Sequence, residues 1–316
     1  MDPESKIYVA GHRGLAGSAI MRELQTQGYS NFVVRTSSEL DLRNQQAVNQ
    51  FFEDEKPDYV FLAAAKVGGI LANSTYPAEF IYDNIMIQTN VIHAAYMNRV
   101  KKLLFLGSSC VYPKFPELPI TEDQLLTGEL ETTNEAYAIA KISGLKMVEF
   151  YNTQFGTDFI SLMPTNLYGP NDNYHPQNSH VLAALVRKFV EATMAERQEV
   201  VIWGTGEPKR EFLYIDDFAN AAVFLMDNYS GSEMVNVGTG KEISINDLAE
   251  LLKELTGFEG NIVHDRSKPD GTYSKVMDIS KLKNLGWSPD ITLRAGLTQI
   301  IADFRNNYNQ YTAIDV

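Results

Sequence analysis

The sequence predicts an α/β protein with a doubly wound parallel sheet and a smaller, interleaved C-terminal α/β domain. Short apolar runs alternate with longer helical patterns through the first half of the chain, which is typical of βαβ units with right-handed crossovers. The chain has 316 residues, more than one domain of about 150 residues needs. Neither a repeat nor a flexible linker divides it, so we expect the two domains to be interleaved.

Strand-like and helical patterns follow one another in order through the first half. The apolar runs predict strands over 7–10, 32–35, 59–62, 103–106 and 159–163. Helical periodicity between these runs predicts helices over 18–27, 45–55, 77–99 and 135–155. Proline suits the first turn of a helix because its missing N–H is not needed there, so we expect Pro77 to open the third of these helices.

The second half has a different pattern. Residues 166–180 are rich in Asn, Pro and Gly, which predicts a long irregular loop of the kind that is more often functional than idle. Helices are expected over 181–195, 216–228, 246–256 and 294–304, and strands over 200–203 and 235–237.

Composition excludes several classes of protein. The chain carries 27 Lys and Arg against 40 Asp and Glu, a net charge of −13, which opposes binding of nucleic acid over a broad surface. A single cysteine cannot form an intramolecular disulfide, which favours a reducing cytoplasm. We expect no signal peptide, no membrane span and no metal site, because a basic leader, an apolar run of about 18 residues and ligand-like histidine spacing are all missing from the sequence.

A glycine-rich turn follows the first predicted strand, and it reads GxxGxxG. Such a turn lets a pyrophosphate approach the backbone and the N-terminus of the next helix. A glycine-rich turn without a ligand is the plainer interpretation, but the position after an N-terminal strand favours a dinucleotide. The candidate cofactor residues are Gly11, His12, Arg13, Gly14, Leu15, Ala16 and Gly17.

The end of the second predicted strand bears on the choice of cofactor. An acidic residue there would accept from a ribose 2′-hydroxyl, whereas an arginine accommodates a 2′-phosphate. The chain has Arg35, followed by hydroxyl side chains that include Ser37, and Arg13 can reach the same phosphate. This pattern favours NADP(H) over NAD, although both arginines could also be solvated surface charges. Asp41 and Leu42 resemble the pair that contacts adenine.

A candidate catalytic group combines two segments. Tyr137 and Lys141 are four residues apart and so share one face of a helix. The ammonium is expected to lower the phenol pKa, so that the tyrosine can pass a proton to a carbonyl oxygen. Ser108 and Cys110 follow a predicted strand, at the edge where parallel sheets present catalytic groups.

Together, the strings GHRGLAG, AAAKVGGI, GSSCVYP, NEAYAIAK, PTNLYGP, REFLYIDD and SKPDG resemble the extended short-chain dehydrogenase/reductases, and among them the family that makes GDP-L-fucose. The resemblance implies a Rossmann domain over 1–165, with returns near 211–238, and a nucleotide-sugar domain over 166–210 and 239–316. It also implies a bifunctional NADPH-dependent enzyme that epimerises C3 and C5 of GDP-4-keto-6-deoxymannose and then reduces C4. A homodimer is expected through the helices that begin near Pro77 and Glu135.

The same resemblance assigns roles to individual residues. Ser108, Tyr137 and Lys141 would form the reductase triad, and Cys110 and His180 would be the base and acid of epimerisation. Further cofactor contacts would come from Lys141, Pro164, Asn166, Leu167 and His180. Substrate contacts would come from Asn166, Lys188, Trp203, Arg210 and Asp270.

Plainer interpretations stay open at this stage. Cys110 could be an inert, small apolar residue, Trp203 a core residue, and Lys188 a solvated helix position. A nucleotide-sugar 4-epimerase, 4-reductase or 4,6-dehydratase, and an NADP-binding sensor without catalysis, are the competing functions. An intact Tyr137 and Lys141 pair opposes the last of these.

Overall fold

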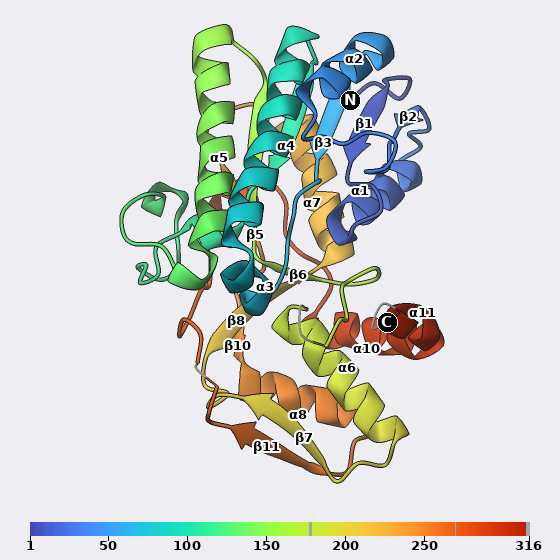
Figure 1. The fold of residues 1–316 in the computed structure, drawn as a ribbon, viewed down its shortest axis with the longest axis vertical. Helices are drawn as coiled ribbons and strands as arrows, with labels where there is room; N and C mark the ends of the chain where they lie inside the picture. The colour runs from blue at the N-terminus through green and yellow to red at the C-terminus, as the bar shows by residue number, and fades with distance from the viewer. Residues whose placement is uncertain (177–178, 269, 314–316) are drawn as a thin grey trace.

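A computed structural model describes residues 1–176, 179–268 and 270–313, and its upper part is an α/β layer structure around one sheet (Figure 1). Every neighbouring pair of strands in this sheet is parallel, and the order is β2-β1-β3-β4-β5-β9. The predicted doubly wound parallel sheet is therefore confirmed. The strands are β1 (Ile7–Ala10), β2 (Phe32–Val33), β3 (Tyr59–Leu62), β4 (Lys102–Leu106), β5 (Phe159–Pro164) and β9 (Val235–Val237).

These strands form because their side chains can be buried on both faces of the sheet. β1 and β4 are buried along their whole length, as expected for strands covered on both sides. β2 is shorter than the predicted strand over 32–35, because the chain turns out of the sheet after Val33.

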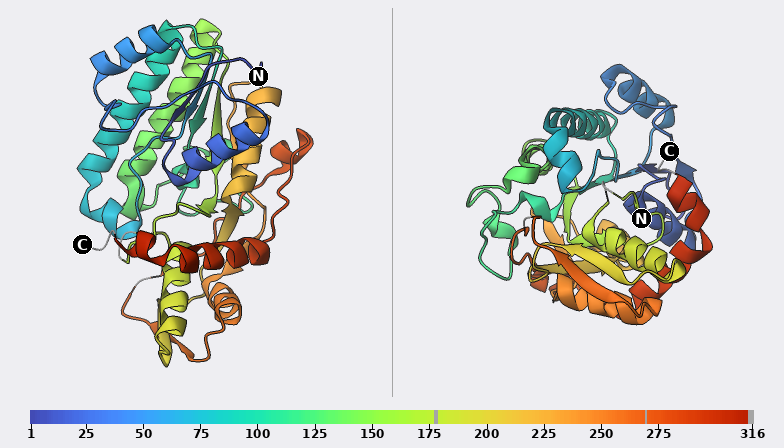
Figure 2. Two further views of the ribbon diagram at one scale, coloured as in Figure 1. Left: turned by 90° about the vertical axis from the view of Figure 1, so that its right-hand side faces the viewer. Right: turned by 60° about the horizontal axis from the view of Figure 1, so that its bottom comes forward.

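Helices cover both faces, and Figure 2 shows the two helical layers with the sheet between them. One layer packs around Val48, Val91 and Leu145 and the other around Ile20 and Phe218, all of them buried. Burying one such side chain stabilises the fold by about 1.5–3 kcal/mol. The first layer is α2 (Gln45–Glu55), α4 (Pro77–Met97) and α5 (Glu135–Phe155), and the second is α1 (Leu15–Thr26) and α7 (Ile215–Asn228).

The lower part of the molecule has two small sheets and a separate apolar cluster. One sheet has the order β10-β8-β6, and in the other β11 pairs in parallel with β7. Phe189, Leu252 and Phe304 anchor the apolar cluster between them and the helices. The elements are β6 (Asn166–Tyr168), α6 (Val181–Met194), β7 (Glu199–Trp203), β8 (Lys209–Tyr214), β10 (Glu242–Ser244), α8 (Ile245–Thr256), β11 (Asn261–Asp265), α9 (Ser280–Asn284), α10 (Leu293–Asn306) and α11 (Tyr308–Thr312).

The structure corrects the predicted loop over 166–180. Its first three residues form β6, which pairs with β8, and residues 177–178 lie outside the described residues. The sequence analysis missed β8 itself because its run begins with Lys209, Arg210 and Glu211. Charged residues are unusual in a strand that is mostly buried, and their partners come from distant parts of the chain. The helix α3 (Ile70–Thr75), β10, β11, α9 and α11 were also not predicted.

Among the described residues, every helix is too short or too polar to cross a bilayer. The same part of the chain contains no group of three or more His, Cys, Asp or Glu side chains placed to hold a metal ion.

Candidate active site

The glycine-rich turn between β1 and α1 is built for a close approach of backbone to ligand. Gly11 has φ +83°, and a Cβ there would lie 2.8 Å from the Ala64 nitrogen. A Cβ on Gly17 would overlap the Gly11 carbonyl group. The Gly14 N–H donates to the Gly11 oxygen at 3.0 Å, and Gly14 caps α1 without any side-chain acceptor. The first N–H groups of α1 are thus left for an anion such as a pyrophosphate.

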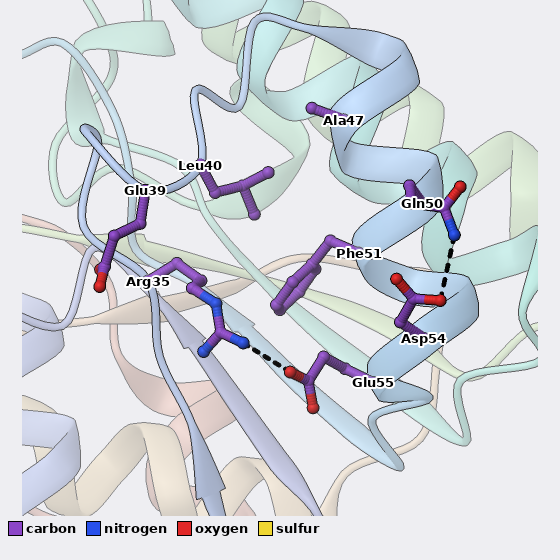
Figure 3. Close-up of a pocket in the computed structure, with 8 residues that line it drawn as sticks. All are labelled: Arg35, Glu39, Leu40, Ala47, Gln50, Phe51, Asp54 and Glu55. Atoms are coloured by element: carbon purple, nitrogen blue, oxygen red, sulfur yellow. Dashed lines mark hydrogen bonds and ion pairs between the residues drawn. The ribbon is translucent and has the colours of Figure 1, made fainter.

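Arg35 lies at the other end of the candidate cofactor site, beside a surface cavity of about 330 Å³. Figure 3 shows its guanidinium turned toward α2, where it pairs with Glu55 at 2.6 Å. The guanidinium carbon lies 5.5 Å from the ring centre of Phe51. The cation is therefore held in place by the protein, and it retains N–H groups that can donate to a phosphate. The cavity is lined by Arg35, Glu39, Leu40, Ala47, Gln50, Phe51, Asp54 and Glu55.

An acidic residue does follow β2, and the sequence analysis overlooked it. Glu39 accepts from the N–H and the hydroxyl of Thr36, each at 2.7 Å, and these hydrogen bonds hold the pKa of its carboxyl below the usual value. Arg13 and Ser37, which the sequence analysis assigned to the cofactor site, are both exposed.

The two residues predicted to contact adenine form hydrogen bonds within the protein. Asp41 binds the Arg43 guanidinium at 2.9 Å, and the carbonyl of Leu42 accepts from Asn90 at 2.9 Å. In the glycine turn, the buried Nδ1 of His12 has no hydrogen-bond partner among the described residues, and burial lowers the pKa of this imidazole.

The candidate catalytic group forms where β4 ends and α5 begins. Tyr137 and Lys141 lie one helical turn apart on the buried side of α5, as their spacing predicts. The Ser108 side chain lies close enough to interact with the Tyr137 hydroxyl, and Lys141 Nζ donates to the Leu106 carbonyl at 2.7 Å. Electrostatic interactions also connect Cys110 to Tyr137 and to Lys141. The structure therefore brings the predicted Ser108, Cys110, Tyr137 and Lys141 together.

Burial, rather than the lysine, controls the Tyr137 pKa, which corrects the expectation stated above. Desolvation raises the pKa of the Tyr137 phenol, and the interaction with Ser108 opposes this. Lys141 points its Nζ at the Leu106 carbonyl and lies 4.8 Å from the ring centre of Phe105. Burial lowers the pKa of Lys141 to about 7. The phenol accordingly stays protonated at neutral pH, as a proton donor must.

Cys110 occupies a short 3-10 turn, Ser109–Val111, directly after β4. Its backbone N–H donates to the Ser108 hydroxyl oxygen at 3.3 Å, so Ser108 caps this turn. The residue is partly exposed, and its sulfur accepts from Asn134 Nδ2 at 3.3 Å. This thiol therefore belongs neither to a fully buried side chain nor to an isolated surface residue.

His180 is the N-cap residue of α6, a helix in the lower part of the molecule (Figure 1). Its side chain does not cap the helix. The residue is exposed, while the protein around it lowers the pKa of the imidazole by desolvation. In the described part of the chain no hydrogen bond or ion pair joins His180 to the Cys110 group.

Most of the residues predicted to bind the sugar nucleotide lie near one another in the lower part of the molecule. Lys188 Nζ lies 5.7 Å from the ring centre of Trp203, which is 56% exposed and so is not a core residue. Asp270 accepts from the N–H of Thr205 at 2.9 Å. The next residue, Gly271, lies against the Arg210 guanidinium, because a Cβ added at Gly271 would be 2.7 Å from Arg210 Nη2. Desolvation lowers the pKa of both Lys188 and Arg210. An indole face, two cations and a carboxylate are thereby collected in one region.

Pro164, Asn166 and Leu167 lie where the chain leaves β5 and enters β6. Asn166 donates to the Glu211 carbonyl at 2.8 Å, while Leu167 packs against the apolar cluster of the large sheet. This segment thus connects the carboxyl end of β5 to the sheet of the lower part.

Two residues of this region had no role in the sequence analysis. Glu211 is completely buried and accepts from the N–H groups of Thr239, Gly240 and Met277. Lys268 Nζ lies 5.3 Å from the Trp203 ring centre. Sequence signals for both existed, because they belong to the strings REFLYIDD and SKPDG, but only the fold shows their partners.

Comparison with known proteins agrees with this geometry. A model of the NAD dependent epimerase/dehydratase family matches residues 7–238. GDP-L-fucose synthase 1 of Arabidopsis thaliana is 63% identical over 298 residues, which span 94% of this chain and 92% of that protein. GDP-L-fucose synthase of Escherichia coli strain K12 is 50% identical over 317 residues, 98% of this chain and 99% of that protein.

Among solved structures, a GDP-L-fucose synthetase from Naegleria fowleri bound to NADP superimposes with a TM-score of 0.90 at 33% identity. The match covers 98% of this chain and 95% of that one. The chain belongs to the NAD dependent epimerase/dehydratase family, alongside the GDP-L-fucose synthases.

Proposed function

We propose that this protein converts GDP-4-keto-6-deoxy-D-mannose to GDP-L-fucose, by epimerisation at C3 and C5 followed by NADPH-dependent reduction at C4. The observation that carries the proposal is the single group formed by Ser108, Cys110, Tyr137 and Lys141 at the carboxyl end of β4. A reductase alone needs the serine, tyrosine and lysine. A thiol next to them adds a base for proton transfer at carbon.

The cofactor site fits NADP(H). Residues 11–17 supply a turn in which Gly11 and Gly17 leave no room for a Cβ, followed by the free N–H groups of α1. Arg35 and Arg13 supply cations for the 2′-phosphate, with Ser37, Asp41 and Leu42 beside the adenosine. When bound, NADPH supplies a hydride to C4. We assign this site to residues 1–165 with the returning segment near 211–238, and the sugar nucleotide to residues 166–210 and 239–316.

Epimerisation requires removal of a proton from one face of a carbon and return of a proton to the other. The C4 ketone acidifies the hydrogens at C3 and C5. The Cys110 thiolate takes the proton, and His180 gives one from the opposite side. Ser108 and Tyr137 donate hydrogen bonds to the C4 oxygen, which becomes an enolate oxygen during each inversion.

Reduction then uses the same hydrogen bonds. Tyr137 releases its proton to the C4 oxygen as the ketone becomes an alcohol, because burial has kept the phenol protonated. Lys141 stands one turn further along α5 and binds the nicotinamide ribose. Pro164, Asn166 and Leu167 line the nicotinamide side, where β5 passes into β6.

The GDP group belongs to the lower part of the molecule. Lys188 and Arg210 suit a diphosphate, because a desolvated cation pairs strongly with phosphate oxygens. The exposed indole of Trp203 offers a face for stacking, and Asp270 can accept from hydroxyl or N–H groups.

We infer that the enzyme is a cytoplasmic homodimer that uses α4 and α5. These helices pack side by side on one flank of the molecule (Figure 1), and they leave large apolar side chains exposed. A second copy of this surface would bury them in a symmetric contact. The exposed side chains are Tyr82, Met97, Ile139, Phe150 and Phe155.

The test is incubation with NADPH and GDP-4-keto-6-deoxymannose, following cofactor absorbance. We expect one NADPH oxidised for each GDP-L-fucose formed. Tyr137→Phe should bind NADPH normally and lose about 10²- to 10⁴-fold in turnover. Cys110→Ser should suppress deuterium exchange from solvent at C3 and C5. Turnover of other nucleotide 4-ketosugars, with none of this one, would favour a related 4-epimerase or 4-reductase instead.

A further inference from the structure

One amide side chain beside the catalytic group has an arrangement that its place in the helix does not explain. Asn134 is the N-cap residue of α5, where an asparagine normally accepts a hydrogen bond from the first turn. Here the side chain makes no such bond. Its Nδ2 donates instead to the sulfur of Cys110 at 3.3 Å.

The other end of the same amide has no protein partner. Asn134 Oδ1 is buried, and no hydrogen-bond donor in the described chain reaches it. Leaving a buried oxygen unsatisfied and forgoing a helix cap both cost stability. A residue that bears both costs while contacting a reactive group is a candidate for a functional position.

We propose that Asn134 is a positioning residue that stabilises the thiolate form of Cys110 through its N–H group; this inference rests on the proposed function, in which that thiolate is the epimerisation base. A hydrogen bond donated to a charged acceptor is stronger than one donated to a neutral acceptor. Asn134 therefore favours loss of the thiol proton and fixes the direction in which the sulfur points.

Other groups near the sulfur act in parallel. Tyr137 and Lys141 face it from α5, and Ser108 precedes it in its own turn. A variant that changes only position 134 leaves these three groups in place. Their influence then cancels when variant and parent are compared, and the amide contribution remains.

The single cysteine makes a direct test possible, because a thiol reagent reports on Cys110 alone. We would measure the rate of iodoacetamide alkylation of the full-length enzyme against pH. Asn134→Leu has nearly the same size but no donor, and we expect its alkylation midpoint to rise by about one pH unit. Asn134→Ala should shift the midpoint in the same direction. Thr132→Ala, at an exposed position in the turn before α5, is the control and should leave the midpoint unchanged.

A second measurement separates this inference from the proposed function. If the Cys110 thiolate is the base, deuterium exchange at C3 and C5 in Asn134→Leu should fall about tenfold near neutral pH and recover at higher pH. A raised midpoint with unaltered exchange supports the role of Asn134 and refutes Cys110 as the base. A midpoint that stays the same or falls in both Asn134 variants overturns the inference, since a fall would mean that the amide oxygen, not the N–H, faces the sulfur.

Discussion

Replacing Lys141 with methionine should make protein stability less dependent on pH. The Lys141 side chain is 3% exposed, and burial lowers the pKa of its ammonium from 10.5 to about 7. In the unfolded chain the amine regains its ordinary value. Between these two values the unfolded state binds more protons than the folded state, so stability rises with pH. Below pH 7 both states are protonated, and the whole cost of burying the charge is present.

The size of the effect follows from the two pKa values. Between pH 7 and 8.5 the free energy of unfolding should increase by about 1–2 kcal/mol through Lys141 alone. The entropy of unfolding is about 2.1 cal/mol/K per residue. For 316 residues the increase corresponds to a rise in Tm of about 2 °C. Lys141→Met lacks the titrating group and should lose this increment.

The assay is a series of thermal melts between pH 6.5 and 8.5 on the cofactor-free parent, Lys141→Met and Lys146→Met. Lys146 lies on the same helix but pairs with Glu149 at the surface, so its variant controls for the loss of a lysine from α5. The difference in Tm between parent and Lys141→Met should shrink or reverse as pH rises. If the Tm of the parent and the Tm of Lys141→Met changed with pH in parallel, that result would falsify the desolvation of Lys141.

Four further changes have defined outcomes. Gly17→Ala should weaken NADPH binding at least tenfold in a fluorescence titration, because the added Cβ overlaps the Gly11 carbonyl; unchanged affinity would contradict the tight turn. Arg35→Ala should weaken NADPH binding roughly tenfold to a hundredfold and NADH binding little, and an equal loss for both would remove Arg35 from phosphate recognition. Glu211→Gln should lower the free energy of unfolding by about 2 kcal/mol in urea, since the buried carboxylate accepts from several N–H groups; an unaltered midpoint would oppose this. Phe150→Glu should yield monomers by light scattering if α5 forms the dimer contact, whereas a persistent dimer would place that contact elsewhere.

Local sequence patterns predicted the large sheet because each of its strands can be recognised from a few neighbouring residues. The strands over 7–10, 59–62 and 235–237, and the helix over 45–55, have the predicted bounds. Buried parallel strands read as continuous apolar runs, so a few neighbouring residues suffice to identify them. The four-residue spacing of Tyr137 and Lys141 likewise determines a shared helix face without knowledge of the fold.

The missed features depend on contacts between residues distant in sequence. Glu211 is tolerable inside β8 only because N–H groups of residues 239, 240 and 277 turn toward it. No pattern near residue 211 contains that information. The expected effect of Lys141 on Tyr137 was wrong for a similar reason, since helix spacing gives proximity but not the direction of Nζ or the depth of burial. Asn134 begins the string NEAYAIAK and its position predicts a helix cap, but its side chain does not perform that role.

In the mechanism proposed above, differences in burial explain how one site performs two kinds of proton transfer. During epimerisation the C4 oxygen must be stabilised without being permanently protonated, and during reduction it must receive a proton. Desolvation raises the pKa of Tyr137, so the phenol donates a hydrogen bond in the first stage and still holds its proton for the second. Cys110 is instead partly exposed and bound by an amide N–H, which suits a group that must exchange protons repeatedly. The two tasks therefore fall to neighbouring side chains that differ in their access to water.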